Sequence, residues 1–280
     1  MGGGFLAPPT VRDDMDLGLR GKVAVVMAAS EGLGFGAARA LARSGAKVGI
    51  CGRRQDVVEA AANALEKETN AHVFGFAGDV AKPGDAARII DATLQSAGAN
   101  ALDILVNNGG GPPPGPVDKF DDNAWKDAFE LLVLSNVRTC RAAYAHLQRS
   151  GAGSVINIVS TSVKQPIENL VLSNSLRSAV IGFAKTLSLE WAPHKIRVNN
   201  VCPGFMLTKR ADEVIASQAK RENVPFEDAK RKREAAIPLG RMGTLDELGQ
   251  TIAFLASPLS SYITGQTLSV DGGATRWVHG

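Results

Sequence analysis

The feature that most constrains this chain is a repeated alternation of short apolar runs with longer stretches that favour helix. A strand of a parallel sheet reads as a continuous apolar run because helices cover it on both faces. Strands that alternate with helices along a sequence indicate βαβ units. The pattern therefore predicts an α/β fold, a single-domain doubly wound parallel sheet of about seven strands with helices on both faces. The expected strands lie within residues 22–29, 48–51, 72–80, 102–110, 154–162, 196–204 and 266–273.

The size and composition fit one globular domain. The chain has 280 residues, of which 45% are hydrophobic and 21% charged, and no change in composition divides it. We expect residues 21–280 to form the domain and residues 1–20 to form a mobile arm. The formal net charge of +3 is too small to predict binding to nucleic acid or to a membrane surface. The basic cluster at residues 229–234 is expected to be a solvated helix face.

The cysteines and histidines give no sign of a metal site. The cysteines are Cys51, Cys140 and Cys202, which are widely spaced and lie in apolar segments. This pattern argues against both a disulfide framework and a cluster of metal ligands, so we expect a reducing, cytoplasmic location. The four histidines are scattered along the sequence and are expected to be structural or exposed.

A glycine-rich turn joins the first expected strand to the first expected helix. The sequence "AASEGLGFG" at residues 28–36 would bring the free N–H groups of a helix N-terminus close to a pyrophosphate. Three glycines are a weak signal alone, but the strand before them and the helix after them supply the required context. The alternative is a turn that only packs the helix on the strand. The turn residues expected at a nucleotide are Ala28, Ser30, Glu31, Gly32, Leu33 and Gly34.

Several motifs, taken in order, resemble those of the short-chain dehydrogenase/reductase family. They are "GLG" (32–34), "GDV" (78–80), "NNGG" (107–110), "INIVS" (156–160), "VNNVCPG" (198–204) and "SSYITGQTLSVDGG" (260–273). The resemblance covers about residues 22–273 and implies a Rossmann-like fold with a nicotinamide cofactor across the carboxyl ends of the strands. It implies Asp79 and Val80 at the adenine, Asn107 and Gly109 beside the ribose, and Pro203, Gly204 and Thr208 at the nicotinamide end.

The end of the second strand indicates which cofactor is used. Relatives that prefer NAD usually place an acidic residue at the Gly52 position, whereas this chain continues with Arg53 and Arg54. Guanidinium groups bind a 2′-phosphate with paired hydrogen bonds, so we expect NADP, with NAD as the alternative. Glu31 argues against NADP because this turn position is often basic in NADP-binding relatives. Ala28 stands where the family usually has glycine, so a glycine-only backbone conformation there would weaken pyrophosphate binding.

The expected reaction centre departs from the family pattern. The family acts with a serine, a tyrosine thirteen residues later and a lysine four residues after that, assisted by an asparagine. Here the serine is Ser160, but the tyrosine and lysine positions hold Ser173 and Arg177, and the asparagine position aligns with Leu132. The chain also resembles a ketoacyl-carrier-protein-reductase-like subgroup that shares this altered tetrad. Neither Tyr144 nor Tyr262 is in a position to substitute.

Lys164 is a candidate for the missing proton donor. It follows Ser160 by four residues, in a loop that leaves the carboxyl end of the fifth expected strand, where open α/β sheets bind their ligands. A free lysine has a pKa of about 10.4, close to the tyrosine value of about 10. A solvated loop lysine is the equally weighted alternative. Arg177 would remain protonated, and would stabilise charge near the ribose and the substrate oxygen.

Three functions remain open at this stage. The first is an NADP-dependent oxidoreductase that acts on a small ketone or alcohol through Ser160, Lys164, Ser173 and Arg177. The second is a lyase or aldolase-like enzyme in which Lys164 forms a Schiff base. The third is a non-catalytic nucleotide-binding protein. The resemblance also implies a homotetramer or homodimer, and a mobile substrate lid at about residues 205–244.

Overall fold

The computed structural model describes residues 16–277. The strands within them form one parallel sheet of seven strands in the order β3-β2-β1-β4-β5-β6-β7. The predicted α/β class and all seven predicted strands are confirmed. The strands are β1 (Val23–Val26), β2 (Lys47–Gly52), β3 (Val73–Ala77), β4 (Ile104–Asn107), β5 (Ser154–Ile158), β6 (Arg197–Pro203) and β7 (Thr267–Val270).

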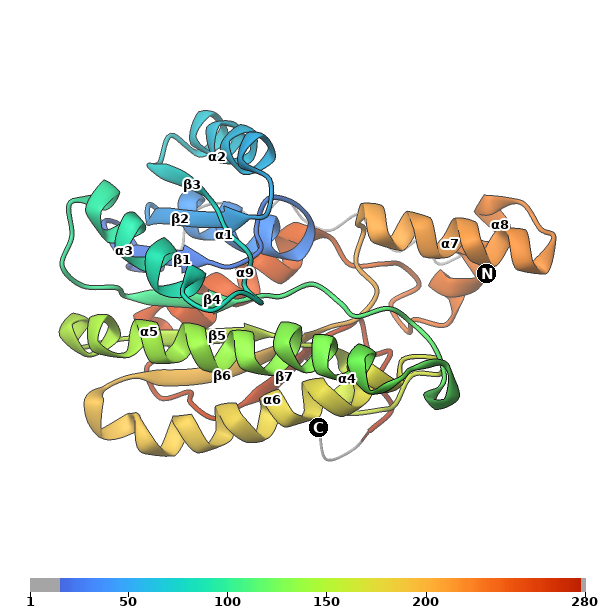
Figure 1. The fold of residues 1–280 in the computed structure, drawn as a ribbon. Coiled ribbons are helices and arrows are strands. Elements are labelled where there is room, and N and C mark those ends of the chain that lie inside the picture. Colours follow the sequence, from blue (N-terminus) through green and yellow to red (C-terminus); the bar gives the residue numbers. More distant parts are fainter. Residues whose placement is uncertain (1–15, 278–280) are drawn as a thin grey trace.

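Helices follow the strands in sequence and cover both faces of the sheet (Figure 1). One face packs against α1, α2 and α9, and the other against α3, α5 and α6. The α-helices are α1 (Gly32–Arg43), α2 (Gln55–Thr69), α3 (Asp85–Ala97), α4 (Asp122–Phe129), α5 (Ser135–Ser150), α6 (Val171–Glu190), α7 (Lys209–Glu222), α8 (Phe226–Ala235) and α9 (Leu245–Ala256). The short helices are η1 (Val117–Lys119), the π-helix η2 (Glu130–Leu134), η3 (Thr161–Val163), η4 (Ala192–His194) and η5 (Pro258–Ser260).

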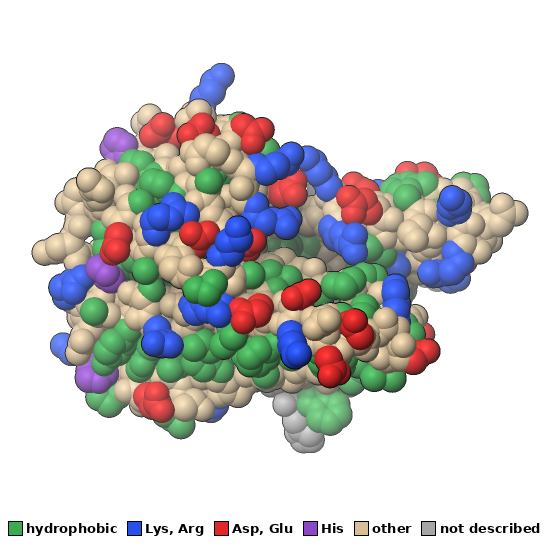
Figure 2. All heavy atoms as spheres, in the orientation of Figure 1, with side chains coloured by type: hydrophobic (Ala, Val, Ile, Leu, Met, Phe, Trp, Pro, Cys, Tyr) green, Lys and Arg blue, Asp and Glu red, His purple; other side chains and the backbone are tan. Residues whose placement is uncertain are grey.

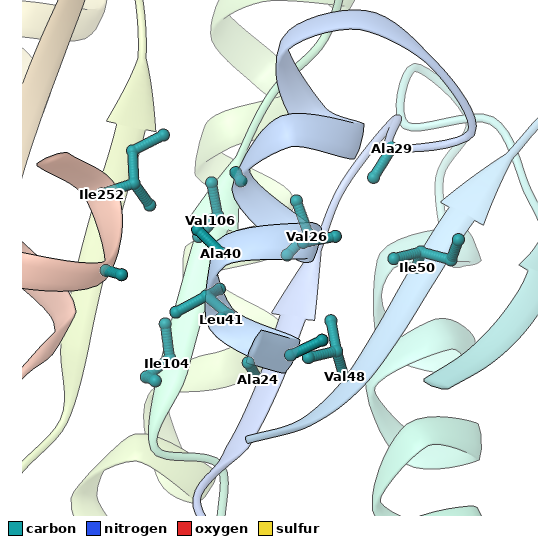
Figure 3. Close-up of a cluster of buried hydrophobic side chains, with 14 of the residues drawn as sticks. Ala24, Val26, Ala29, Ala40, Leu41, Val48, Ile50, Ile104, Val106 and Ile252 are labelled. Atoms are coloured by element: carbon teal, nitrogen blue, oxygen red, sulfur yellow. The ribbon is translucent and has the colours of Figure 1, made fainter. Parts of the chain in front are cut away.

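Side-chain alternation along the strands divides the core into two layers. Ala24 and Val26 of β1 belong to the layer that contains α1, α2 and α9, whereas Val23 and Val25 belong to the layer with α3, α5 and α6. Successive strand residues point to opposite faces, so each apolar strand supplies both layers. Figure 3 shows Val26, Val48, Ile50 and neighbouring side chains gathered beneath α1.

The sheet has its topological switch point beside β1. The chain passes from β1 outward to β2 and β3, then returns to place β4 on the other side of β1. The connections on the two sides of β1 therefore run in opposite directions, which opens a crevice at the carboxyl ends of β1 and β4. This is the edge at which the sequence predicts the nucleotide.

Residues 1–15 of the expected N-terminal arm lie outside the described residues. Within the described part, Leu19 is buried and packs with the layer that contains α1 and α9. The backbone N–H of Gly21 donates to the Gly45 carbonyl at 2.9 Å. The packed domain therefore includes Leu19.

Helices α7 and α8 form a lobe that projects from the carboxyl edge of the sheet (Figure 1). The lobe has a small apolar cluster of its own, which includes Ile215, Ala229 and Met242. Figure 2 shows a recess between the sheet domain and the lobe, with lysine and arginine side chains on both of its sides. Among residues 16–277, no helix is long and apolar enough to cross a membrane.

Candidate active site

A cavity of about 1150 Å³ lies at the carboxyl edge of the sheet, between the β1–α1 turn and the α7–α8 lobe. Most of the residues predicted to hold a nucleotide line it. They are Ala28, Ser30, Glu31, Gly32, Leu33, Arg53, Asp79, Val80, Gly109, Arg177, Gly204 and Thr208. The residues predicted for the site that do not line the cavity are Gly34, Arg54, Asn107, Pro203, Ser160, Lys164 and Ser173. One continuous cavity thus joins the predicted nucleotide positions to Arg177.

The turn at Ala28 adopts a left-handed backbone conformation, with φ of +48°. This conformation costs an L-residue roughly 1–2 kcal/mol, and alanine accepts it without any change in the course of the turn. The Ala28 N–H donates to the Cys51 sulfur at 3.2 Å, and the side-chain amide of Asn108 donates to the Ala28 carbonyl at 2.9 Å. Asn108, which the sequence analysis did not single out, therefore ties the turn to the end of β4.

Glycine at position 34 allows α1 to approach the turn closely. A Cβ atom there would lie 2.7 Å from the Ala28 carbonyl oxygen and 2.8 Å from the Asn108 side-chain nitrogen. The first helical residue is Gly32, so the free N–H groups of α1 lie at the cavity that Gly32 and Leu33 line. An unpaired helix N-terminus of this kind favours an anion.

The two arginines after β2 differ in position. Arg53 lines the cavity, whereas Arg54 is the N-cap residue of α2 and does not. Gly52 packs tightly on the turn, because a Cβ atom there would lie 2.9 Å from the Ser30 hydroxyl oxygen. Glu31 forms an exposed ion pair with Lys209 at 3.8 Å, which places its negative charge toward the α7–α8 lobe.

The segment after β3 forms the adenine side of the predicted nucleotide site. The Asp79 N–H donates to the Asp85 carboxylate at 2.8 Å, and this bond is the main cause of a lowered pKa at Asp85. The Asp79 carboxylate accepts from the Ala81 N–H at 3.0 Å. Val80 is buried at 7% exposure. The backbone at Asp79 and Val80 is thus fixed by local hydrogen bonds, as a wall of the cavity requires.

Asn107 belongs to a buried row of amides that crosses the sheet. Its side-chain nitrogen donates to the Asn157 oxygen at 2.9 Å, and the Asn157 nitrogen donates to the Asn200 oxygen at 2.9 Å. The row ends at β7, where Asn200 donates to the Thr267 hydroxyl at 3.1 Å. Asn107 therefore links β4 to β5, as expected of a residue that steadies the sheet. Sequence reasoning missed Asn157 and Asn200, which were read only as strand residues.

Arg177 reaches from α6 to the ends of β4 and β5. Its Nε donates to the Ser173 hydroxyl at 3.1 Å, one Nη donates to the Val159 carbonyl at 3.1 Å, and the other donates to the Gly110 carbonyl. All of these partners are neutral, so they fix the guanidinium without cancelling its charge. Burial lowers the pKa of Arg177 to about 10, which leaves it protonated at neutral pH.

Ser160 and Lys164 lie beside Arg177, around the buried thiol of Cys202. The Ser160 hydroxyl caps η3 by accepting from the Ser162 N–H at 3.1 Å, and the Ser160 N–H donates to the Cys202 sulfur. Burial raises the pKa of the Cys202 thiol to about 11, and the positive charges of Lys164 and Arg177 oppose this rise. Lys164 is half-buried, and its role as proton donor stays a prediction. Cys202 lies in an apolar run of the sequence, so the sequence alone did not indicate that it lies beside Ser160 and Lys164.

Of the other positions that the sequence singled out, Gly204 and Thr208 line the cavity, whereas Leu132 and Tyr262 do not. Leu132, at the asparagine position, is buried at 3% exposure within the π-helix η2. Gly204 approaches Asp271 so closely that a Cβ atom would lie 2.7 Å from the Asp271 Cβ. Thr208 caps α7 by accepting from the Ala211 N–H at 3.1 Å. Tyr262 is fully exposed and lines a separate cavity of about 560 Å³ that also contains Lys22 and Asp103 at the opposite edge of the sheet.

Comparison with known proteins agrees with this geometry. A family model described as enoyl-(acyl carrier protein) reductase matches residues 27–275. Dehydrogenase/reductase SDR family member 4 of Caenorhabditis elegans is 32% identical over 256 residues, which cover 90% of this chain and 95% of that protein. The chain belongs to the short-chain dehydrogenase/reductase family. The predicted family membership is therefore confirmed, and the chain is placed among oxidoreductases.

Other members of the short-chain dehydrogenase/reductase family that resemble this chain bind NADPH. The NADPH-dependent reductase BacG of Bacillus subtilis is 32% identical over 259 residues, covering 91% of this chain and 98% of that protein. The crystal structure of L-sorbose reductase from Gluconobacter frateurii, complexed with NADPH and L-sorbose, superposes with a TM-score of 0.89 at 30% identity. The superposition covers 94% of this chain and 100% of the L-sorbose reductase chain. These relatives favour a reductase over the lyase and the non-catalytic alternatives.

Proposed function

We propose that this protein is an NADPH-dependent oxidoreductase that interconverts a small ketone and its alcohol, with Ser173 and Arg177 in place of the usual tyrosine and lysine. The observation that carries the proposal is the half-buried Arg177 guanidinium, which lines the predicted nucleotide cavity and donates to Ser173 at 3.1 Å. The NADPH-binding relatives support the cofactor, with NAD as the alternative.

The residues around the cavity suit NADPH. The free N–H groups at the start of α1 would hold the pyrophosphate, and Arg53 would hold the 2′-phosphate where NAD-dependent relatives place an acid. Asp79 and Val80 would border the adenine, and Gly204 and Thr208 the nicotinamide end. Bound NADPH would supply the hydride.

The hydrogen bond from Arg177 determines what Ser173 can do. Because the Ser173 oxygen accepts from Nε, its own O–H is free to donate to a carbonyl oxygen of the substrate. Ser160 would give a second hydrogen bond to that oxygen. The fixed positive charge of Arg177 would stabilise the alkoxide that forms there, and a preorganised charge of this kind contributes strongly to catalysis.

The proton for the alkoxide needs a stronger acid than serine. A positioned general acid contributes roughly 10²–10⁴-fold in rate. We assign this role to Lys164, because its ammonium lies close enough to the Cys202 thiol to influence that group's pKa, and the Ser160 N–H contacts the same thiol. Residues 205–244, which include α7 and α8, would act as a lid that closes over the substrate.

We further propose that the protein forms a homotetramer or homodimer through its long helices, including α6. Leu189 of α6 is an apolar side chain left 70% exposed. A cytoplasmic location fits the three free cysteines, which are all buried.

The test combines binding with turnover. We expect the fluorescence of NADPH to show saturable binding to the protein. We also expect at least one ketone of a panel of small ketones to oxidise NADPH, at a rate that falls in Ser173→Ala and in Lys164→Met. Saturable binding without turnover across the panel would favour the non-catalytic alternative. Borohydride trapping of a substrate adduct on Lys164 would favour the lyase. A lack of saturable binding by folded protein would refute the proposal.

A further inference from the structure

Arg233 forms part of the cavity wall on the α7–α8 lobe. Its guanidinium carbon lies 4.9 Å from the centre of the Phe205 ring, a cation–π distance, and its Nε donates to the Gln218 oxygen at 2.7 Å. The expectation that residues 229–234 are a solvated face is therefore wrong for Arg233. This arginine is half-buried because the ring of Phe205 and the amide of Gln218 hold it in the lobe.

The positive charge of Arg233 has no carboxylate partner among residues 16–277. Its one side-chain hydrogen bond there uses Nε, which leaves both Nη atoms without a protein acceptor. Glu222 is close enough to influence the pKa of Arg233, but its carboxylate is taken by Lys232 at 2.8 Å and by the Gln218 amide at 3.0 Å. Arg241 shows the contrast, since both of its Nη atoms donate to the Glu247 carboxylate.

Arg233 and the reaction centre share one cavity. Arg177 and Arg233 both line it, from the sheet side and from the lobe side. Phe205, on which Arg233 stacks, follows Cys202 by three residues, a backbone span of at most about 10 Å. A substrate that contacts both ends must therefore reach through this cavity from Arg177, which holds Ser173, to Arg233.

We infer that Arg233 binds an oxyanion of the substrate, so the substrate is a carbonyl compound that also carries a carboxylate or a phosphate. The inference rests on the proposed reductase function. A guanidinium with both Nη atoms free presents the planar fork that matches either anion. In the proposed function the phosphates of the cofactor are assigned to Arg53 and to the N-terminus of α1, which leaves Arg233 for the substrate.

The experiment compares charged and neutral ketones on one variant pair. Arg233→Gln removes the charge and keeps a polar side chain that is two atoms shorter than arginine. Arg231→Gln is the matched control, because Arg231 lies on the same helix but is exposed and pairs with Asp228. The substrates are acetoacetate against ethyl acetoacetate, and dihydroxyacetone phosphate against dihydroxyacetone. These arms distinguish a carboxylate from a phosphate.

We expect Arg233→Gln to raise KM for one charged substrate by about 10–100-fold, with the neutral partner changed less than about threefold and Arg231→Gln like wild type. NADPH affinity should stay within about threefold. A KM that is equal for charged and neutral ketones and insensitive to Arg233 would overturn the inference while leaving the reductase function intact. A loss of NADPH affinity in Arg233→Gln would overturn it too, because Arg233 would then bind the cofactor.

A calorimetric arm separates this inference from the proposed function. Acetoacetate and dihydroxyacetone phosphate are titrated into wild-type, Arg233→Gln and Arg231→Gln protein, each saturated with NADP⁺. Binding that weakens by about tenfold or more only in Arg233→Gln supports the inference even if no ketone is turned over. Binding that is equal in all three proteins, or absent from all three, overturns it.

Discussion

The two ends of the cavity are built from different groups. At the predicted nucleotide end, the wall is the β1–α1 turn with the free backbone N–H groups of α1, and Gly34 lets the helix approach the turn closely. At the reaction end, a single half-buried guanidinium from α6 spans the ends of β4 and β5. The first end depends on local spacing in the sequence, whereas the second depends on a side chain that the fold brings in from a distance. Cofactor binding and catalysis should therefore respond separately to substitution.

The largest expected effect is at Arg177. Arg177→Gln removes the charge that faces the substrate oxygen, so we expect kcat to fall by about 10²–10³-fold, the usual loss for one oxyanion-stabilising group. NADPH affinity should fall by less than about tenfold. Stopped-flow turnover and fluorescence titration measure the two quantities, and Arg177→Lys, which keeps a charge, should recover part of the rate. If affinity and rate fell together, the two ends would not be independent.

The next effect is at Arg53. Arg53→Ala should raise the Kd for NADPH by about 10–100-fold, because a hydrogen bond between charged groups contributes about 1.5–3 kcal/mol. The Kd for NADH should not change, since NADH has no 2′-phosphate. Arg54→Ala is the control and should resemble wild type, because Arg54 does not line the cavity. An equal effect on NADPH and NADH would mean that Arg53 acts on the fold.

A smaller effect concerns the support of the nucleotide end. Glu247 is the third residue of α9, which packs on α1. Its carboxylate accepts hydrogen bonds from the Arg241 side chain and from the Thr244 N–H, and these bonds lower its pKa to about 2 although burial opposes the shift. A pKa lowered on folding stabilises the protein above the usual value of about 4.5, and this stabilisation is lost as pH falls toward 2. We expect Glu247→Gln to cost about 1 kcal/mol at pH 7, a value reduced by partial exposure of the pair.

Urea denaturation at pH 7, 5 and 3 measures this difference. The difference in the free energy of unfolding between wild type and Glu247→Gln should be constant down to about pH 5 and smaller at pH 3. Glu190→Gln, at the exposed end of α6, should show no such difference at any of these pH values. A difference in the free energy of unfolding that widened as pH fell would contradict the lowered pKa of Glu247 in the folded protein.

The smallest effect is expected at Ala28. Ala28→Gly relieves the left-handed strain of about 1–2 kcal/mol but adds freedom to the unfolded chain, so the net gain should be less than about 1 kcal/mol. NADPH affinity should change less than about threefold, since the turn already has its glycine-like course. Thermal unfolding and cofactor titration check both values. A large gain in affinity would show that alanine here limits the nucleotide end.

The sequence predicts the nucleotide end better than the reaction end. Continuous apolar runs locate all seven strands, and the spacing of the glycines locates the turn that leads into α1 at Gly32. These are local patterns. The position of Cys202 beside Lys164 and Arg177, and the amide row through Asn157, depend on which strands become neighbours. Arg233 was missed for the same reason, because a basic run on a helix reads as solvated until Phe205 and Gln218 are placed against it.

The π-helix η2 has a consequence for the length of its segment. Residues 122–150 form one continuous rod, α4, η2 and α5, in which the Ser135 hydroxyl donates to the Leu131 carbonyl at 2.5 Å. A π-turn within an α-helix holds one residue more than an α-turn. Deleting one residue of η2 would let α4 and α5 continue as one α-helix with little rotation, whereas deleting one residue of α4 or α5 would turn the helix beyond it by about 100°. An indel scan across the rod should therefore find a single deletion tolerated best within η2, beside the cavity that Leu131 lines.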